Sequence, residues 1–201
     1  FKVQVILKKN LPIASGMAGG SSNAATFILC LKEIFGLKLI KGFNNLLLSL
    51  GADVPFCFFR KTALVSGIGE NLTFTRKLKE YYILLVNPQI EVSTKEIFCK
   101  IVFKKDSKNQ THNNKITNSF IKKSNDLQPF AIKKHKIIGE ILSHLSNCEG
   151  VVINRMTGSG ATCFALFENV DDLVRAEVFI KKTFKSFWIK KAKLVNSVKY
   201  I

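Results

Sequence analysis

The sequence lacks the features that mark membrane-spanning and secreted proteins. Its 201 residues contain no uninterrupted apolar run of about 18, the length that a helix needs to cross a bilayer. No charged segment followed by an apolar core and a small-residue cleavage site opens the chain, so we expect no secretory signal and a cytoplasmic location. Apolar residues still make up 47% of the chain, which is enough for a buried core in one large domain or two small ones.

Metal-binding and disulfide motifs are also absent. The five cysteines are scattered, with no CxxC pair and no Cys/His cluster at the spacing of metal ligands, and the three histidines have no partner at such spacing. We therefore predict no protein metal site and reduced thiols that mostly serve as core residues. The cysteines are Cys30, Cys57, Cys99, Cys148 and Cys163.

Acidic residues are few, and so are arginines. The chain has 14 acidic and 31 basic residues, a net charge of +17, but only four of the basic residues are arginine. A basic nucleic-acid-binding domain is one interpretation of this charge. Because arginine is the favoured residue for phosphate and guanine recognition, we give more weight to compositional drift toward lysine, asparagine, isoleucine and phenylalanine.

The pattern of apolar and polar residues predicts a mixture of strands and helices. We expect strands at 1–9, 81–88 and 187–195, a hairpin at 62–74, and a strand–turn–strand unit at 151–168. We expect helices at 21–36, 42–51, 93–103, 127–146 and 171–184, and a loop at 104–119. Because strands and helices do not alternate strictly, these elements favour an α+β fold over a doubly wound parallel sheet.

A glycine-rich stretch, LPIASGMAGGSSNAA at residues 11–25, joins the first predicted strand to the first predicted helix. Its glycines allow positive φ angles and a close approach of backbone N–H groups to an anion, and a helix N-terminus favours phosphate. Its spacing is neither that of the P-loop nor that of the dinucleotide-binding motif. On these residues alone, the stretch is either a phosphate-binding loop or a turn that merely requires glycine. The candidate helix caps are Ser21, Ser22 and Asn23.

Two later segments add candidates for chemistry. Asp53, in LGADVPFCFF, is the only aspartate in the first hundred residues. Its carboxylate suits a proton acceptor in phosphoryl transfer, but an aspartate before Pro55 is also common in turns and caps. Residues 157–162, TGSGAT, form a predicted tight turn between two strands, which serves either to approach a ligand or simply to reverse the chain.

Taken together and in this order, these motifs resemble those of the GHMP kinases, a family of small-molecule kinases. PIASGMAGGSSNAA is similar to the family's central phosphate loop, and TGSGATCFALF is similar to its C-terminal glycine-rich motif. The resemblance implies an α+β architecture of two domains. We expect 1–76 to belong to an N-terminal domain like domain 2 of ribosomal protein S5, and 77–201 to a ferredoxin-like C-terminal domain. Homoserine, mevalonate and galactose kinases are nearby alternatives within the family.

The resemblance also implies a cofactor and roles for particular residues. ATP, carrying Mg²⁺, would be the phosphoryl donor to a small-molecule alcohol, while the oligomeric state stays open. Asp53 would be the catalytic base, Thr94 would contact the substrate, and Gly158, Ser159 and Gly160 would line the site. The ATP phosphate loop would comprise Pro12, Ile13, Ala14, Ser15, Gly16, Met17, Ala18, Gly19, Gly20, Ser21 and Ser22.

The sequence departs from the family pattern in two respects. Ser15 and Ala18 stand where glycine is frequent, and Ala18 would be strained if its φ were positive. The family's catalytic lysine belongs to a segment that would precede Phe1, and Lys8 and Lys9 do not match it. We therefore expect this chain to be part of a longer kinase, with an inactive gene fragment as the alternative.

Overall fold

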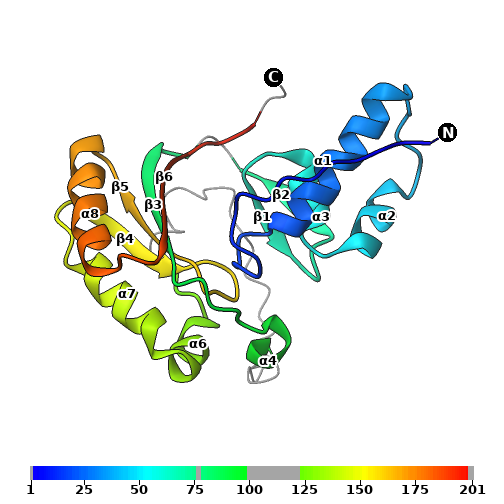
Figure 1. The fold of residues 1–201 in the computed structure, drawn as a ribbon. Coiled ribbons are helices and arrows are strands. Elements are labelled where there is room, and N and C mark those ends of the chain that lie inside the picture. Colours follow the sequence, from blue (N-terminus) through cyan, green and yellow to red (C-terminus); the bar gives the residue numbers. More distant parts are fainter. Residues whose placement is uncertain (1, 76–77, 99–122, 199–201) are drawn as a thin grey trace.

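The computed structural model describes residues 2–75, 78–98 and 123–198. These residues form two units that lie next to each other, one built by the first part of the chain and one by the rest (Figure 1). Each unit has its own hydrophobic cluster, a small one in the first unit and a much larger one in the second. In the part of the chain that the structure describes, no helix is both long enough and apolar enough to span a membrane.

Three helices and a hairpin make up the N-terminal unit. The helices pack around Ala25, Leu47, Val54 and Phe58, and the Phe58 ring contacts the Phe43 ring edge to face at 5.2 Å. The hairpin predicted at 62–74 is confirmed, with its two strands antiparallel. The elements are α1 (Gly19–Ile34), α2 (Phe43–Leu50), α3 (Val54–Phe59), β1 (Ala63–Ser66) and β2 (Asn71–Phe74).

A four-stranded antiparallel sheet is the centre of the C-terminal unit. Its strand order is β4-β5-β3-β6, with helices between β3 and β4 and between β5 and β6. This is the order of a ferredoxin-like domain, so the predicted α+β fold of the GHMP type is confirmed. The elements are β3 (Tyr81–Asn87), α4 (Thr94–Phe98), α6 (Gln128–Lys134), α7 (Lys136–Ser146), β4 (Val151–Met156), β5 (Cys163–Phe167), α8 (Val170–Thr183) and β6 (Trp188–Leu194).

The two faces of this sheet have different neighbours. Because side chains alternate along a strand, Leu84 and Val86 of β3 point to the face that α7 and α8 cover, and both are fully buried. The intervening Ile83 and Leu85 point to the opposite face, as do their β5 partners Leu166 and Phe164. The second face is therefore available to form one wall of a cavity.

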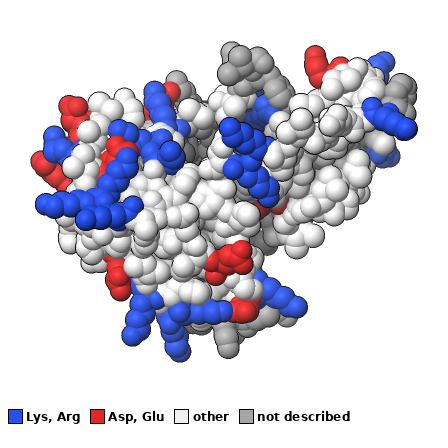
Figure 2. Space-filling model, in the orientation of Figure 1, with Lys and Arg blue, Asp and Glu red and all other residues white. Residues whose placement is uncertain are grey.

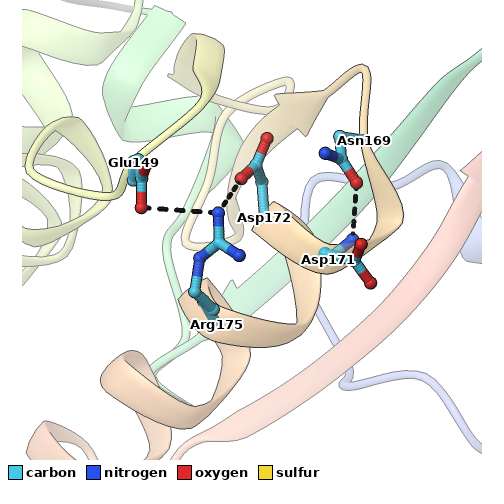
Figure 3. Close-up of polar contacts among 5 residues, drawn as sticks. All are labelled: Glu149, Asn169, Asp171, Asp172 and Arg175. Carbon is cyan, nitrogen blue, oxygen red and sulfur yellow. Dashed lines mark hydrogen bonds and ion pairs between the residues drawn. The ribbon is translucent and has the colours of Figure 1, made fainter.

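Polar contacts fix the start of α8 on the turn before β4 (Figure 3). Asn169 Oδ1 accepts a hydrogen bond from the backbone N–H of Asp171 at 2.8 Å, which caps the helix. Arg175 binds Asp172 on its own helix and Glu149 on the preceding turn, the latter at 3.4 Å. The short turn before β4 is thereby joined to the helix that covers the sheet.

The chain end after β6 returns to the N-terminal unit and links the two units. The carbonyl of Asn196 accepts from the backbone N–H of Thr62 at 3.0 Å. The Asn196 side chain accepts from the N–H of Leu78 at 2.6 Å and donates to the carbonyl of Leu78 at 3.0 Å. Asn196 thus binds both Thr62, the residue before β1, and the segment that leads into β3.

Three predictions of local structure are wrong. Residues 2–9 form no strand, because none of the described strands pairs with them and the alternating pattern alone supplies no ladder hydrogen bonds. The helix expected at 127–146 is two helices, α6 and α7, since His135 has strand-like angles (φ −131°, ψ 87°). Helix α1 begins at Gly19, so Ser21, Ser22 and Asn23 lie inside it and do not cap it. The loop predicted at 104–119 lies outside the described residues.

Candidate active site

A cavity of about 1270 Å³ lies between the two units and gathers most of the predicted site residues. It is lined by every residue from Pro12 to Gly20, by Asp53 of the α2–α3 turn, by Thr94 of α4, and by Gly158 and Ser159 of the β4–β5 turn. Ser21, Ser22 and Gly160 do not line it. The fold therefore brings three sequence motifs to one site: the glycine-rich loop, the segment around Asp53 and the TGSGAT turn. The first and the last of these are more than 100 residues apart in the chain.

The N-terminus of α1 presents uncapped backbone donors to this cavity. The first helical hydrogen bond runs from Ser22 N–H to the carbonyl of Ala18 at 2.8 Å, and no side chain caps the N–H groups before it. Gly19 and Gly20, which carry two of those N–H groups, line the cavity. A 16-residue helix whose first turn opens on a cavity in this way favours an anion there.

The two glycine-rich turns touch each other through their backbones. Thr157 Oγ1 donates to the carbonyl of Gly16 at 3.1 Å. A Cβ atom on Gly16 would lie 2.7 Å from the Gly160 carbonyl oxygen, and one on Gly158 would lie 2.7 Å from the Gly16 carbonyl oxygen. Side chains at these two positions would therefore force the turns apart, which is the physical reason for glycine in both motifs.

A hydroxyl pair connects the β4–β5 turn to α4. Ser159 Oγ and Thr94 Oγ1 are 2.9 Å apart, and Ser159 is only 8% exposed. The pair fixes the two hydroxyls at the cavity wall, where they can also bind polar groups of a ligand.

Asp53 occupies the N-cap position of α3, but its side chain makes no capping hydrogen bond. The residue is exposed and lines the cavity. The β1–β2 turn packs closely on Ala52, the residue before Asp53. A Cβ atom on Gly69 of that turn would lie only 2.9 Å from the Ala52 carbonyl carbon. Burial raises the pKa of the Cys57 thiol, and the negative charge of Asp53 raises it further. The carboxylate thus lies at the cavity wall and is not used to cap α3.

The site contains no preformed metal centre among the described residues. No group of three or more His, Cys, Asp or Glu side chains there is arranged to hold a metal ion. The described cysteines, Cys30, Cys57, Cys148 and Cys163, are free thiols, and burial raises the pKa of Cys163 to about 12. Cys99 lies outside the described part of the chain.

The cavity also contains residues that sequence patterns did not indicate. Lys8 and Lys9 are the basic residues that line it, and they lie just before the glycine-rich loop. Its sheet-side wall is apolar, and single apolar residues in strands carry no signal of a ligand site. The remaining lining residues are Asn10, Leu11, Asn23, Phe56, Val65, Leu78, Ile83, Leu85, Leu127, Thr157, Phe164, Leu166 and Leu194.

Comparison with known proteins identifies both halves of the chain with one family. Residues 1–61 match the GHMP kinases N terminal domain, and residues 108–186 match the GHMP kinases C terminal domain. The 4-diphosphocytidyl-2-C-methyl-D-erythritol kinase of Geobacter sulfurreducens is 37% identical over 178 residues, which are 87% of this chain and 63% of the relative. That of Clostridium beijerinckii is 35% identical over 202 residues, covering 93% of this chain and 70% of the relative. The chain thus spans less than two thirds of the Geobacter relative.

Comparison with solved structures leads to the same family. A 4-(cytidine 5'-diphospho)-2C-methyl-D-erythritol kinase superposes with a TM-score of 0.73 at 25% identity, covering 92% of this chain and 68% of the other. A homoserine kinase from Cytophaga hutchinsonii has a TM-score of 0.70 at 15% identity, covering 94% and 69%, and this likeness shows the fold alone. From its motifs, its topology and these relatives, the chain belongs to the GHMP kinase family.

Proposed function

We propose that this chain forms part of an ATP-dependent kinase that phosphorylates the 2-hydroxyl of 4-diphosphocytidyl-2-C-methyl-D-erythritol, in the non-mevalonate pathway to isoprenoids. The names of its relatives support this substrate. The observation that carries the proposal is the cavity, in which an uncapped helix N-terminus, two interlocked glycine turns and an aspartate meet. A cytoplasmic location is part of the same proposal.

In this proposal, the loop from Pro12 to Ser22 holds the ATP phosphates. The uncapped N–H groups at the start of α1 fit a polyanion, and the positive end of the helix replaces part of the charge that a P-loop lysine supplies elsewhere. Lys8 and Lys9 add positive charge at the cavity wall. Mg²⁺ would enter with the nucleotide and neutralise phosphate charge.

In this proposal, Asp53 accepts the proton of the substrate hydroxyl as that oxygen attacks the terminal phosphorus of ATP, and the bond from that phosphorus to the bridging oxygen breaks to release ADP. Phosphoryl transfer depends on positioning and on charge neutralisation more than on covalent chemistry by the enzyme. Thr94 and Ser159 hold polar groups of the substrate through their paired hydroxyls, and Gly158 and Gly160 keep the turn close to the loop. We also propose that the boundary between the two family domains lies at residues 76 and 77, between the hairpin and β3.

Replacement of Asp53 tests the proposal. Asp53→Asn removes the proton acceptor and keeps the size of the side chain, so we expect kcat to fall by about 10²- to 10⁴-fold. The measurement is ADP release from ATP with the cytidyl substrate, made on the natural protein that carries this chain. Asp171→Asn, at the start of α8 and away from the cavity, is the matched control with expected full activity. Full activity of the Asp53 variant would refute the assigned role.

A substrate panel separates the proposed substrate from those of other family members. We expect ADP release with the cytidyl substrate and none above background with homoserine, mevalonate or galactose. Faster turnover of any of these three would reassign the substrate while leaving the kinase fold in place.

A further inference from the structure

Strand β4 lies at one edge of the sheet, and two amide side chains bind its last residue. Gln128 Oε1 accepts from the backbone N–H of Met156 at 2.9 Å, and Asn125 Nδ2 donates to the carbonyl of Met156 at 2.8 Å. An edge strand has outward N–H and C=O groups that need partners. Here two side chains supply the bonds that a neighbouring strand would otherwise make.

Asn125 does more than complete the strand edge. Its Nδ2 group also donates to the carbonyl of Gly158 at 2.8 Å, and its Oδ1 accepts from the N–H of Leu127 at 2.9 Å. The two carbonyls that it binds flank Thr157, the residue whose hydroxyl donates to Gly16. The side chain therefore fixes the carbonyls of the residues before and after Thr157, whose hydroxyl makes the contact between the two glycine turns.

We propose that Asn125 is a positioning residue of the active site, which holds the Thr157–Gly160 turn against the Gly16 loop. Asn125 is not among the residues that line the cavity, so in this proposal it acts through Thr157 and the Gly16 backbone. The expected effect of Asn125 on ATP binding rests on the proposed kinase function. The expected effect of Asn125 on the position of the turn is independent of that function, because the contacts lie within the protein itself.

The chain offers a matched pair of substitutions for the test. Asn125→Asp removes both N–H donors and places a negative charge next to two carbonyl oxygens. Gln128→Glu makes the same change of charge in the same segment, but a carboxylate oxygen still accepts from Met156 N–H. Both replacements preserve the shape of the side chain. They differ in which group of the native amide binds Met156: Asn125 uses its N–H donor, and Gln128 uses its oxygen acceptor.

The first measurement is hydrogen exchange at the amide of Gly160, which donates to the Thr157 carbonyl at 2.9 Å within the turn. We expect exchange at least about tenfold faster in Asn125→Asp and within about twofold of the natural protein in Gln128→Glu. Unchanged exchange in Asn125→Asp, or equal acceleration in both variants, would overturn the proposal. If Asn125→Asp does not fold, Asn125→Ala removes the donors without adding charge, and the same criteria apply.

The second measurement is the response to ATP, by equilibrium binding and by steady-state kinetics. We expect about tenfold weaker ATP binding and a correspondingly higher KM for ATP in Asn125→Asp, with Gln128→Glu unchanged. Equal losses in the two variants would reduce Asn125 to a general structural role and contradict the proposal. Failure of the natural protein to bind ATP would refute the proposed function instead, and the exchange comparison would still decide whether Asn125 holds the turn.

Discussion

Two alanines of the glycine-rich loop adopt a backbone conformation that glycine normally supplies. Ala14 and Ala18 have φ angles of 49° and 50°, in the left-handed region. An L-residue with a Cβ is disfavoured there by about 1–2 kcal/mol. The strain expected for Ala18 if its φ were positive is thus present, and it lies at the N-cap of the helix that opens on the cavity.

Replacement of Ala18 by glycine should relieve this strain. We expect Ala18→Gly to raise the free energy of unfolding by about 0.5–1 kcal/mol, because removal of the Cβ clash outweighs the greater entropy of glycine in the unfolded chain. Urea denaturation measures the change. Ala24→Gly, inside α1, is the control and should lower the free energy of unfolding by about 1 kcal/mol or more. A loss of stability in Ala18→Gly would show that the loop is not strained.

At the scale of elements, helix ends depend on tertiary contacts as well as on local signals. Gly36 ends α1 as expected, with a φ of 60° and a bond from Leu37 N–H to the Lys32 carbonyl at 3.0 Å. The break between α6 and α7 at His135 has no comparable sequence signal. It reorients α7 so that Ile138, Ile141 and Leu145 are fully buried in the core of the C-terminal unit.

The middle of α8 is joined to the edge strand β6 by an ion pair. Glu177 binds Lys181 on its own helix at 2.7 Å and Lys191 of β6 at 2.6 Å. Burial by itself would raise the pKa of Glu177, but the hydrogen bonds and charges of the two lysines lower it overall. A lowered folded-state pKa means that these pairs stabilise the fold above the ordinary pKa of about 4.5 and lose that effect as the pH falls through the folded value.

Glu177→Gln should therefore destabilise the protein in a pH-dependent way. We expect a loss of about 0.5–1 kcal/mol in the free energy of unfolding at neutral pH, reduced by solvent screening of the exposed lysines. The difference from the natural protein should shrink as the pH falls below about 4.5 and vanish once the native carboxyl is itself protonated, below its lowered folded-state pKa. Denaturation at several pH values measures it, with Glu33→Gln on α1 as the control for a lost charge. A difference that did not depend on pH would exclude the ion pairs as its cause.

At the scale of the molecule, the described residues on the face drawn in Figure 2 do not carry one continuous positive surface. On the face drawn in Figure 2, lysine and arginine side chains lie in several separate groups, with acidic side chains between some of them. Several lysines are paired with acids, as Lys79 is with Glu168 and Lys193 with Glu80. This distribution does not resemble the concentrated basic stripe of a nucleic-acid-binding domain.

We accordingly expect only weak, salt-sensitive binding to nucleic acid. A fluorescence anisotropy titration with an oligonucleotide of about 20 residues should give no Kd tighter than about 1 μM at about 0.15 M salt. Any binding at low salt should fall steeply as salt is added, because it reflects counterion release. Submicromolar binding at physiological salt would revive the interpretation of the +17 charge as a nucleic-acid-binding feature.

The sequence by itself determined the elements whose signals are local. Alternating and buried apolar runs gave β3 to β6, helical periodicity gave α1, α2 and α8, and the order of motifs led to the family. These features succeed because turn residues, caps and periodicity act within a few residues of one another. The same locality explains why residues 2–9 form no strand despite their alternating pattern, since a strand exists only with a partner.

The tertiary structure decided what the motifs do together. Only folding places Thr157 on Gly16, Ser159 on Thr94, and Asp53 at the wall of the same cavity. Asn125 has no sequence signal beyond that of a turn residue, yet it binds the carbonyls of Met156 and Gly158, the residues on either side of Thr157. These contacts join residues 31 to 141 positions apart, so they depend on how sheets and helices pack, and no local pattern encodes that packing.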